Sequence, residues 1–213
     1  MWQRVARVLR QAGHDVVAPS LTGIGERAHL ASPSVDLSAH IADVLGAIRY
    51  ERLTELVLVG HSYGGMVVTG VADRAPEAVK TLVYLDAFVP QSGQALVDLV
   101  RAEVRAHFPK DATAIPPLPP QAQGMTDRDE IAWFDGRRDP QPIKTFTQPL
   151  ALEGRYRGAR AYVFCTGYSP TSFTPFAERA RNDRAWRYHE LATHHYPHVS
   201  LPDETAGVLL NYS

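Results

Sequence analysis

Apolar positions along this chain follow two alternating spacings, one typical of amphipathic helices and one typical of buried strands. Near the start, a helical spacing ends at Gly13, a residue suited to stopping a helix. This predicted helix face consists of Trp2, Val5, Ala6, Val8 and Leu9. The run 14–19 then predicts a short buried strand, and Asp36 is predicted to open a second helix with an apolar repeat at three and four residues.

The same alternation continues to the other end of the chain and predicts the fold class. Leu56 to Val59 form a continuous apolar run, as expected of a parallel strand covered on both faces. Helices and strands that alternate in this way indicate an α/β fold with a doubly wound, mostly parallel sheet. The later predicted elements are a helix at 66–75, a strand at 81–85, a strand at 161–165, a helix at 175–181, a strand at 186–191 and a helix at 202–210.

The alternation is interrupted between residues 90 and 158. An amphipathic stretch at 96–108 leads into the proline-rich run 115–120, where proline excludes the interior of a helix or sheet. We interpret 90–158 as an inserted cap, flanked by the two parts of the core at 1–89 and 159–213.

Composition and charge narrow the partner and the compartment. The 213 residues are 45% hydrophobic and carry a formal charge of -1, so a full core can form and no global field recruits nucleic acid or an anionic membrane. No apolar stretch has the length of a membrane span. Cys165 is the single cysteine, which fits a reducing compartment. We therefore expect a cytoplasmic protein whose partner is a small molecule, and we keep a homodimer as an open hypothesis.

Candidate chemistry centres on the turn from Gly60 to Gly65, Gly-His-Ser-Tyr-Gly-Gly, which lies between a predicted strand and a predicted helix. In a Gly-x-Ser-x-Gly turn the serine sits at a sharp corner with its hydroxyl exposed. We expect that glycine is needed at positions 60 and 64 because a side chain there would collide where strand and helix come close. Ser62 is therefore the candidate nucleophile, and the Tyr63 backbone N–H is the candidate oxyanion donor.

A serine hydroxyl needs a base, and the segment Thr193 to His198 offers three histidines after the last predicted strand. We choose His195, because the closing helix opens at the expected distance after it. His194 and His198 are interpreted as neighbours that pack, hydrogen-bond or contact ligand. His14, His40 and His61 have weaker claims, since such histidines more often lie on a surface or helix face.

The acid that would hold the imidazole is harder to assign. In this kind of fold the acid usually lies in the loop after the seventh strand. Here that loop is 165–170, and it contains no carboxylate. Asp86 follows the strand next to that of Ser62 and lies at the same sheet edge, so we favour Asp86, whose alternative role is to fix the strand-end loop. Glu178 and Asp183 lie farther along, in or beyond the next helix.

Other chemistries lack a pattern in this sequence. Cys165 could in principle replace serine as a nucleophile, but it has no glycine turn, so a small core residue is the favoured interpretation. No helical pair of His and carboxylate residues indicates a metal, and no glycine-rich turn indicates a phosphate or dinucleotide cofactor. We expect an enzyme without cofactor or metal.

Several further segments resemble one group of proteins, the α/β-hydrolases that include plant methylesterases, hydroxynitrile lyases and bacterial pyrethroid-type esterases. With the serine turn, the segments that carry the resemblance are 22–30, 84–90, 147–150 and 186–191. The resemblance implies a cofactor-free hydrolase for esters with bulky apolar parts, with Ser62 as nucleophile and His195 as base. Asp86 remains an inference from position.

The start of the chain departs from that group. Its members place two or three strands before the first helix, and the last of them ends in a His-Gly loop that supplies half of the oxyanion hole. From this difference we expect an N-terminally truncated chain, with a gap beside the strand of Leu56 to Val59 and with Tyr63 as its visible oxyanion donor.

Three functions are compatible with this pattern. Carboxylic ester hydrolysis through an acyl-enzyme is the leading hypothesis. A hydroxynitrile lyase would want a cation near the leaving cyanide, and none of Lys80, Lys110 and Lys144 has an obvious claim to that position. A binding protein on the same scaffold is the third. The cap aromatics suggest an aromatic or apolar ligand, although they could equally form the core of the cap; these residues are Phe108, Trp133, Phe134, Phe146 and Tyr156.

Overall fold

The structure, a computed structural model, describes residues 1–106, 108 and 111–213. Its centre is a four-stranded parallel sheet with the strand order β1-β2-β5-β6. The strands of this sheet are β1 (Leu56–Ser62), β2 (Val79–Ala87), β5 (Ala159–Cys165) and β6 (Trp186–Leu191). The predicted α/β class and parallel sheet are therefore confirmed. Because all four strands run in one direction, their carboxyl ends share one edge of the sheet.

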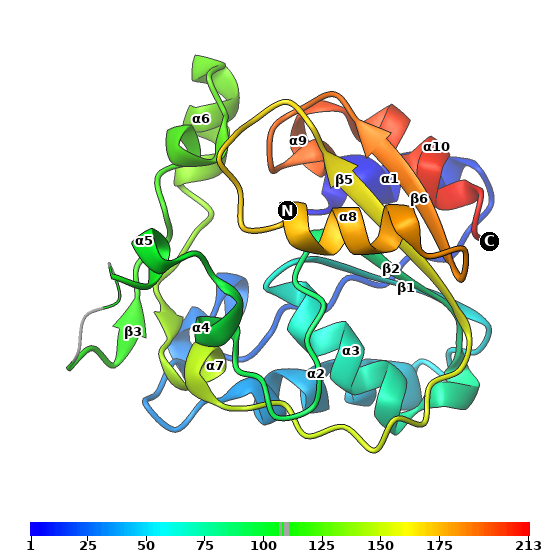
Figure 1. Cartoon of the computed structure of the whole chain (residues 1–213), viewed down its shortest axis with the longest axis horizontal. Helices are drawn as coiled ribbons and strands as arrows, with labels where there is room; N and C mark the ends of the chain where they lie inside the picture. Colours follow the sequence, from blue (N-terminus) through cyan, green and yellow to red (C-terminus); the bar gives the residue numbers. More distant parts are fainter. Residues whose placement is uncertain (107, 109–110) are drawn as a thin grey trace.

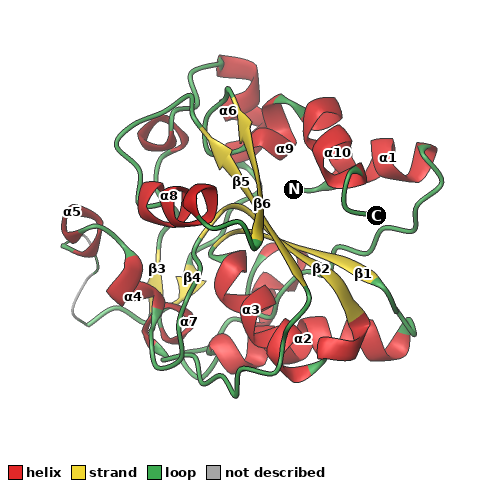
Figure 2. Cartoon of the chain, turned by 45° about the vertical axis from the view of Figure 1, so that its right-hand side comes forward, coloured by secondary structure: helices red, strands yellow, loops and turns green. Residues whose placement is uncertain are grey.

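Helices cover both faces of this sheet (Figure 1, Figure 2). On one face, α1 and α10 contact each other and pack over Val83, Leu85 and Val163. On the other face, α3 and α8 enclose Leu82, Tyr84 and Tyr162, and α2 packs against α3. Strand residues alternate between these two clusters, as a pleated strand requires. The helices are α1 (Gln3–Gln11), α2 (Leu37–Tyr50), α3 (Gly64–Arg74), α8 (Thr174–Asn182) and α10 (Pro202–Leu210).

The helix predicted to open at Asp36 forms as α2, but the strand predicted at 14–19 does not form. Asp36 caps α2, and its carboxylate accepts a hydrogen bond from Ala39 N at 2.9 Å. Residues 14–21 instead have no regular secondary structure, and Val17 is 46% exposed. A strand requires a neighbour to pair with, whereas the carbonyl of Val16 accepts its hydrogen bond from the Arg10 guanidinium.

The segment 90–158 contributes short elements and none of the four strands of the central sheet. The predicted amphipathic stretch 96–108 forms two separate short helices, and residues 107, 109 and 110 lie outside the described part of the chain. In Figure 1, α6 lies at one corner of the molecule and α4, α5 and α7 lie along the same side. The elements are α4 (Leu96–Leu99), α5 (Ala102–Arg105), β3 (Ala114–Ile115), η3 (Pro120–Gln123), α6 (Arg128–Asp135), β4 (Gln141–Pro142) and α7 (Lys144–Thr147).

Contacts of this segment bring it over the carboxyl edge of the sheet. Met125 and Phe134 pack against Tyr196 and Val199, which lie in the loop after β6 and in the short helix α9 (Pro197–Ser200). The division into a core and a cap at residues 90 and 158 stays a prediction. Among the described residues, every helix falls short of the length and apolarity needed to cross a membrane.

Candidate active site

The turn that carries Ser62 is a sharp corner between strand and helix. Ser62 is the last residue of β1, and α3 begins two residues later at Gly64. Its φ of 55° lies in the left-handed region, which a residue with a side chain rarely occupies. Such a conformation costs on the order of 1 to 3 kcal/mol and persists only where neighbours hold it. One holding contact is the hydrogen bond from Phe88 N to the Ser62 carbonyl, at 3.2 Å.

Close packing explains the glycines at positions 60 and 65 of this turn, whereas we expected it at positions 60 and 64. A Cβ on Gly60 would lie 2.5 Å from Val68 Cγ2 and 2.7 Å from the Gly64 carbonyl oxygen. A Cβ on Gly65 would lie only 2.0 Å from the Phe88 carbonyl oxygen, whereas a Cβ on Gly64 would meet nothing within 4 Å. The expectation for Gly64 was therefore wrong. The helix start approaches β2 through Gly65, one residue later.

A β-bulge at the end of β2 turns Asp86 out of the regular strand alternation. His61 pairs with Leu85 and Ser62 pairs with Ala87, so Asp86 has no partner across the ladder. Its φ of 43° is also positive. Bulges of this kind re-aim a side chain and are frequent beside active sites. The carboxylate of Asp86 is thereby directed to the edge of the sheet and is fully buried.

Asp86 and His195 form a buried hydrogen-bonded pair. The Nδ1 of His195 lies 2.7 Å from Oδ2 of Asp86, and the two residues are 1% and 0% exposed. A carboxylate can only accept, so Nδ1 carries the proton and donates it to Asp86. This arrangement leaves Nε2 as the basic nitrogen of a neutral imidazole. The ring is held flat against Phe173, with centroids 4.9 Å apart and planes 9° apart.

His61 places this pair next to the serine corner. The Nε2–H of His61, the residue before Ser62, donates to the His195 carbonyl at 2.6 Å, and the two imidazole rings lie 4.4 Å apart. Ser62 is partly buried, and its Oγ makes no hydrogen bond with any residue that the structure describes, His195 included. The serine, the imidazole and the carboxylate are thus gathered at one edge, from β1, the loop after β6 and β2.

Tyr63 contributes an unpaired donor and a fixed side chain. Its backbone N–H donates to no residue within the described part of the chain, and it lies at the amino end of α3. Its hydroxyl lies 2.8 Å from Nδ1 of His40, whose Nε2–H donates to the Thr22 carbonyl at 2.8 Å. Since Nε2 of His40 is the protonated nitrogen, Nδ1 accepts from Tyr63. Burial lowers the pKa of His40, which keeps this acceptor neutral.

The loop after β5 supplies a group that the sequence reasoning missed. The hydroxyl of Tyr168 donates to Oδ2 of Asp86 at 2.7 Å and lies 3.2 Å from His195 Nδ1. Thr171 Oγ1 is 2.9 Å from the same hydroxyl, and Cys165 N–H donates to Asp86 Oδ1 at 3.3 Å. The signal in the sequence is a tyrosine in the loop 165–170, which lacks the expected carboxylate.

The remaining histidines and the cysteine have other contacts. The Nε2 of His194 lies 3.4 Å from Glu130 Oε2 on α6, and its Nδ1 accepts from Tyr196 N. His198 is buried and stacks on Trp2 at 4.8 Å. Burial raises the pKa of the Cys165 thiol well above its usual value, so it is no thiolate nucleophile. Within the ranges that the structure covers, no group of His, Cys, Asp and Glu is placed to hold a metal ion.

Two of the five aromatic residues of the predicted cap connect to the ring of Tyr63, one directly and the other through the first. The ring of Phe146 lies 5.7 Å from that of Tyr63, and the ring of Phe108 lies 5.7 Å from that of Phe146. Phe134 instead packs on Tyr196, in the loop after β6. The other two contact arginine side chains, Trp133 between Arg4 and Arg137 and Tyr156 beneath Arg160. The ring contacts of Phe146 and Phe108 thus lead to the residue after Ser62, and the expectation of an aromatic or apolar ligand stays a prediction.

Comparison with known proteins gives matches over the whole chain. The sequence matches the alpha/beta hydrolase family over residues 1–208. It is 38% identical to a carbendazim hydrolyzing esterase of Nocardioides sp. (strain SG-4G), over 98% of this chain and 92% of that protein. It is 35% identical to an alpha-hydroxynitrile lyase of Arabidopsis thaliana, over 43% of this chain and 36% of the lyase. An extracellular alpha/beta-hydrolase from a Paenibacillus species superposes with a TM-score of 0.86 at 23% identity, covering 100% of this chain and 93% of that one.

Proposed function

Because this chain belongs to the alpha/beta hydrolase family, we propose that it is a carboxylic ester hydrolase with Ser62 as its nucleophile. The observation that carries the proposal is the buried Asp86–His195 hydrogen bond of 2.7 Å at the edge where the strained Ser62 corner ends β1. A neutral imidazole with its Nδ1–H fixed on a carboxylate has Nε2 free to accept a proton. That is the state in which a histidine activates a serine hydroxyl.

The first half of the reaction forms an acyl-enzyme. Ser62 Oγ attacks the ester carbonyl carbon while His195 Nε2 takes the hydroxyl proton. The carbonyl oxygen becomes an anion and receives a hydrogen bond from the Tyr63 N–H, aided by the positive end of α3. The carbon–oxygen bond to the alcohol then breaks, and His195 returns its proton to the leaving alkoxide. Asp86 stabilises the imidazolium that exists between these proton transfers.

The second half restores the enzyme. A water molecule gives a proton to His195 Nε2 and attacks the acyl carbon, and the bond to Ser62 Oγ breaks as the imidazolium reprotonates the serine. The products are a carboxylic acid and an alcohol. Each step uses only groups of the protein and water, so the proposal requires no cofactor.

We propose small esters with an apolar or aromatic part as the substrate class. The Tyr63, Phe146 and Phe108 rings form a chain of contacts that starts at the residue after the nucleophile. The relative that is similar over 98% of the chain is named for hydrolysis of carbendazim, which makes carbendazim a test substrate for this protein. Aromatic rings bind flat apolar groups through area burial and offset stacking.

A serine-directed probe tests this proposal. The wild-type protein is expected to be labelled covalently by a fluorophosphonate, to consume carbendazim and to release acid from a chromogenic aryl ester. Ser62→Ala should lose both the label and the activity, whereas Ser34→Ala, at an exposed position, should keep both. An unlabelled wild-type protein, or a labelled Ser62→Ala variant, would refute the assignment and favour a binding protein on this scaffold.

A hydroxynitrile lyase is the alternative enzyme, supported by the match to the Arabidopsis protein. It would take a proton from a cyanohydrin and form no acyl-enzyme. The side chains of Lys80 and Lys144 are exposed, Lys80 near the start of β2 at the opposite end of the sheet from Ser62, and Lys110 lies outside the described residues. Release of cyanide from mandelonitrile without ester cleavage would select the lyase.

We also propose that the protein acts in the cytoplasm. Its one cysteine, Cys165, is buried and unpaired, so the fold owes nothing to disulfides that an oxidising compartment would form. Immunodetection in fractionated cells of the source organism tests the location, and recovery from the culture medium would refute it.

A further inference from the structure

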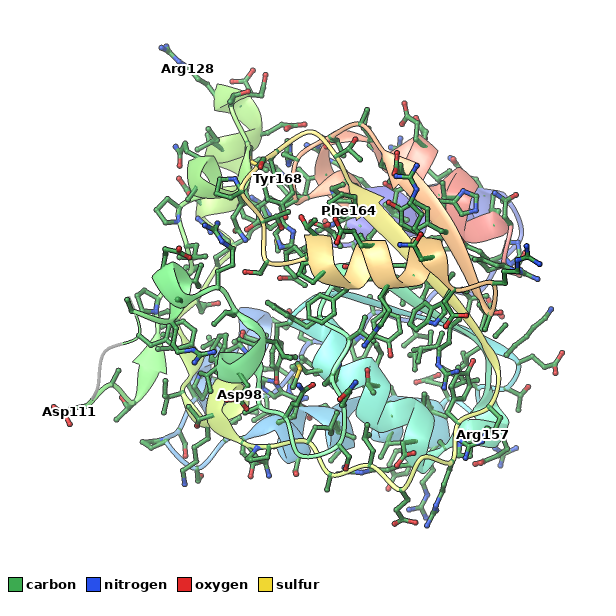
Figure 3. The ribbon with its side chains drawn as sticks, viewed as in Figure 1. Asp98, Asp111, Arg128, Arg157, Phe164 and Tyr168 are labelled. Atoms are coloured by element: carbon green, nitrogen blue, oxygen red, sulfur yellow. The ribbon has the colours of Figure 1, made fainter. Side chains whose placement is uncertain are left out.

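Asp86 accepts three hydrogen bonds, two of them on the same oxygen. Oδ2 receives the Nδ1–H of His195 and the hydroxyl of Tyr168, each at 2.7 Å, and Oδ1 receives the backbone N–H of Cys165 at 3.3 Å. The proposed mechanism uses only the first of these. Tyr168 lies in the loop that follows β5 and is labelled in Figure 3 on the side of the sheet that faces α6.

From this geometry we propose that Tyr168 is a positioning residue of the esterase site, which holds the Asp86 carboxylate in the orientation that fixes the His195 tautomer. The inference rests on the proposed function, because it assigns Tyr168 a role in that same reaction. Tyr168 does not touch the reacting atoms. It acts through Asp86.

The direction of each hydrogen bond follows from the donors that are available. Phe173 N–H donates to Thr171 Oγ1 at 3.1 Å, so the hydroxyl proton of Thr171 is free to point to Tyr168 at 2.9 Å. Tyr168 then donates its own proton to the carboxylate, which can only accept. The resulting chain runs from Thr171 through Tyr168 to Asp86, where it meets the proton of His195. Hydrogen bonds that run in one direction polarise one another.

The Tyr168 hydroxyl is a lasting donor in this environment. Burial and the neighbouring Asp86 charge raise the pKa of the Tyr168 phenol far above its usual range, so the group keeps its proton. Its oxygen is also 3.2 Å from His195 Nδ1, which lets the imidazole proton lie between the carboxylate and the phenol. Apart from His195, the other hydrogen bond that restricts rotation of the carboxylate about χ2 is the longer one from Cys165 N–H to Oδ1, at 3.3 Å. The Tyr168 donor on Oδ2 restricts this rotation further.

A contact with the cap gives the tyrosine a second, purely structural task. A Cβ on Gly124, which has a φ of 87°, would lie 2.5 Å from Tyr168 Cβ, so the cap packs tightly on this loop. A substitution that shortens the side chain would disturb that packing. Tyr168→Phe is therefore the informative change, because it keeps the ring and removes only the hydroxyl.

A double-mutant cycle separates positioning from packing. We expect Tyr168→Phe to lower kcat by about 10- to 100-fold with KM nearly unchanged, the fold-change that corresponds to losing one hydrogen bond to a charged group. In an Asp86→Asn background the same substitution should change kcat by less than about 2-fold, because the carboxylate on which it acts is absent. The matched control is Tyr188→Phe, which removes a surface hydroxyl bonded to Glu190 and should leave kcat unchanged.

A spectroscopic signature provides a readout that packing alone would not move. The low-field proton resonance of His195 Nδ1–H should shift in Tyr168→Phe and stay in place in Tyr188→Phe. If Tyr168→Phe does not fold by circular dichroism, Thr171→Val serves instead. It breaks the chain one step earlier and should lower kcat by a smaller factor that again disappears beside Asp86→Asn.

The outcomes distinguish this inference from the proposed function. A fall in activity of the same size in both backgrounds, or an unshifted proton resonance, would overturn the positioning role. The esterase assignment would survive either result. Full activity in Asp86→Asn or Ser62→Ala would instead overturn the proposed function and this inference with it.

Discussion

Replacing Gly65 by alanine is the sharpest test of how the serine corner is held. The added Cβ would lie 2.0 Å from the Phe88 carbonyl oxygen and 3.0 Å from Phe88 N. Ordinary van der Waals contact begins at 3.4 Å, so these atoms must separate by 1.4 Å, the difference between 3.4 and 2.0. Both partners are backbone atoms, which have no flexible side chain to move away.

The cost can be worked out from two contributions. Overpacking in a rigid site costs about 1 to 3 kcal/mol. Moving the Phe88 backbone also breaks or weakens the hydrogen bond from Phe88 N to the Ser62 carbonyl, worth about 1 kcal/mol. We therefore expect Gly65→Ala to lower the free energy of unfolding by about 2 to 4 kcal/mol. In a chain of 213 residues each kcal/mol lowers Tm by about 2 to 4 °C.

The neighbouring glycine is the matched control. A Cβ on Gly64 meets nothing within 4 Å, and the residue opens α3 with an ordinary helical backbone. Alanine there should leave stability unchanged or raise it by about 0.4 to 1 kcal/mol, because it restricts the unfolded chain. Urea unfolding followed by circular dichroism, with equal m-values in the two variants, measures the difference.

Two results would refute this reasoning. One is a Gly65→Ala protein within about 0.5 kcal/mol of wild type, the range of a harmless surface change. The other is a Gly64→Ala protein as unstable as Gly65→Ala. Either would mean that the corner at Ser62 does not depend on the close approach of α3 to the end of β2.

Two further predictions concern the buried histidines. His61→Leu removes the donor to the His195 carbonyl and should lower the free energy of unfolding in urea by about 1 to 3 kcal/mol. His29→Leu, on the exposed surface, should leave it almost unchanged. Equal losses of stability in the two variants would contradict the role of this hydrogen bond. Burial lowers the pKa of His198 from 6.5 to about 3, so the folded state favours the neutral ring. The contribution of this group to the stability of the fold is therefore complete above pH 6.5 and is lost as the pH falls from 6.5 towards 3. We expect a loss of about 2 kcal/mol from this group between pH 7 and pH 5, measured by urea unfolding at each pH. His198→Phe should flatten the dependence in part, since burial also lowers the pKa values of His61, His40 and His194 and these groups contribute with the same sign. An unchanged slope would contradict the assignment.

The sequence alone determined the α/β class and most elements of the sheet and its helices. Continuous apolar runs and helical repeats are local properties of the chain, and they placed β1, β2, β5 and β6 to within a few residues. The Gly-x-Ser-x-Gly turn likewise indicated the sharp corner at Ser62, since a local motif suffices to identify it. The strand predicted at 14–19 failed, because a strand also requires a partner and that segment has none within the described chain.

The tertiary structure decided which side chains meet. Asp86 and His195 are 109 residues apart, and their hydrogen bond depends on a bulge that appears only when β1 and β2 pair. The role of Gly65 depends on the Phe88 backbone across the sheet, and that of Tyr168 on a carboxylate 82 residues away. Residue spacing along a chain cannot supply such contacts. They arise because parallel strands bring their carboxyl ends to one edge, where loops from distant parts of the sequence pack together.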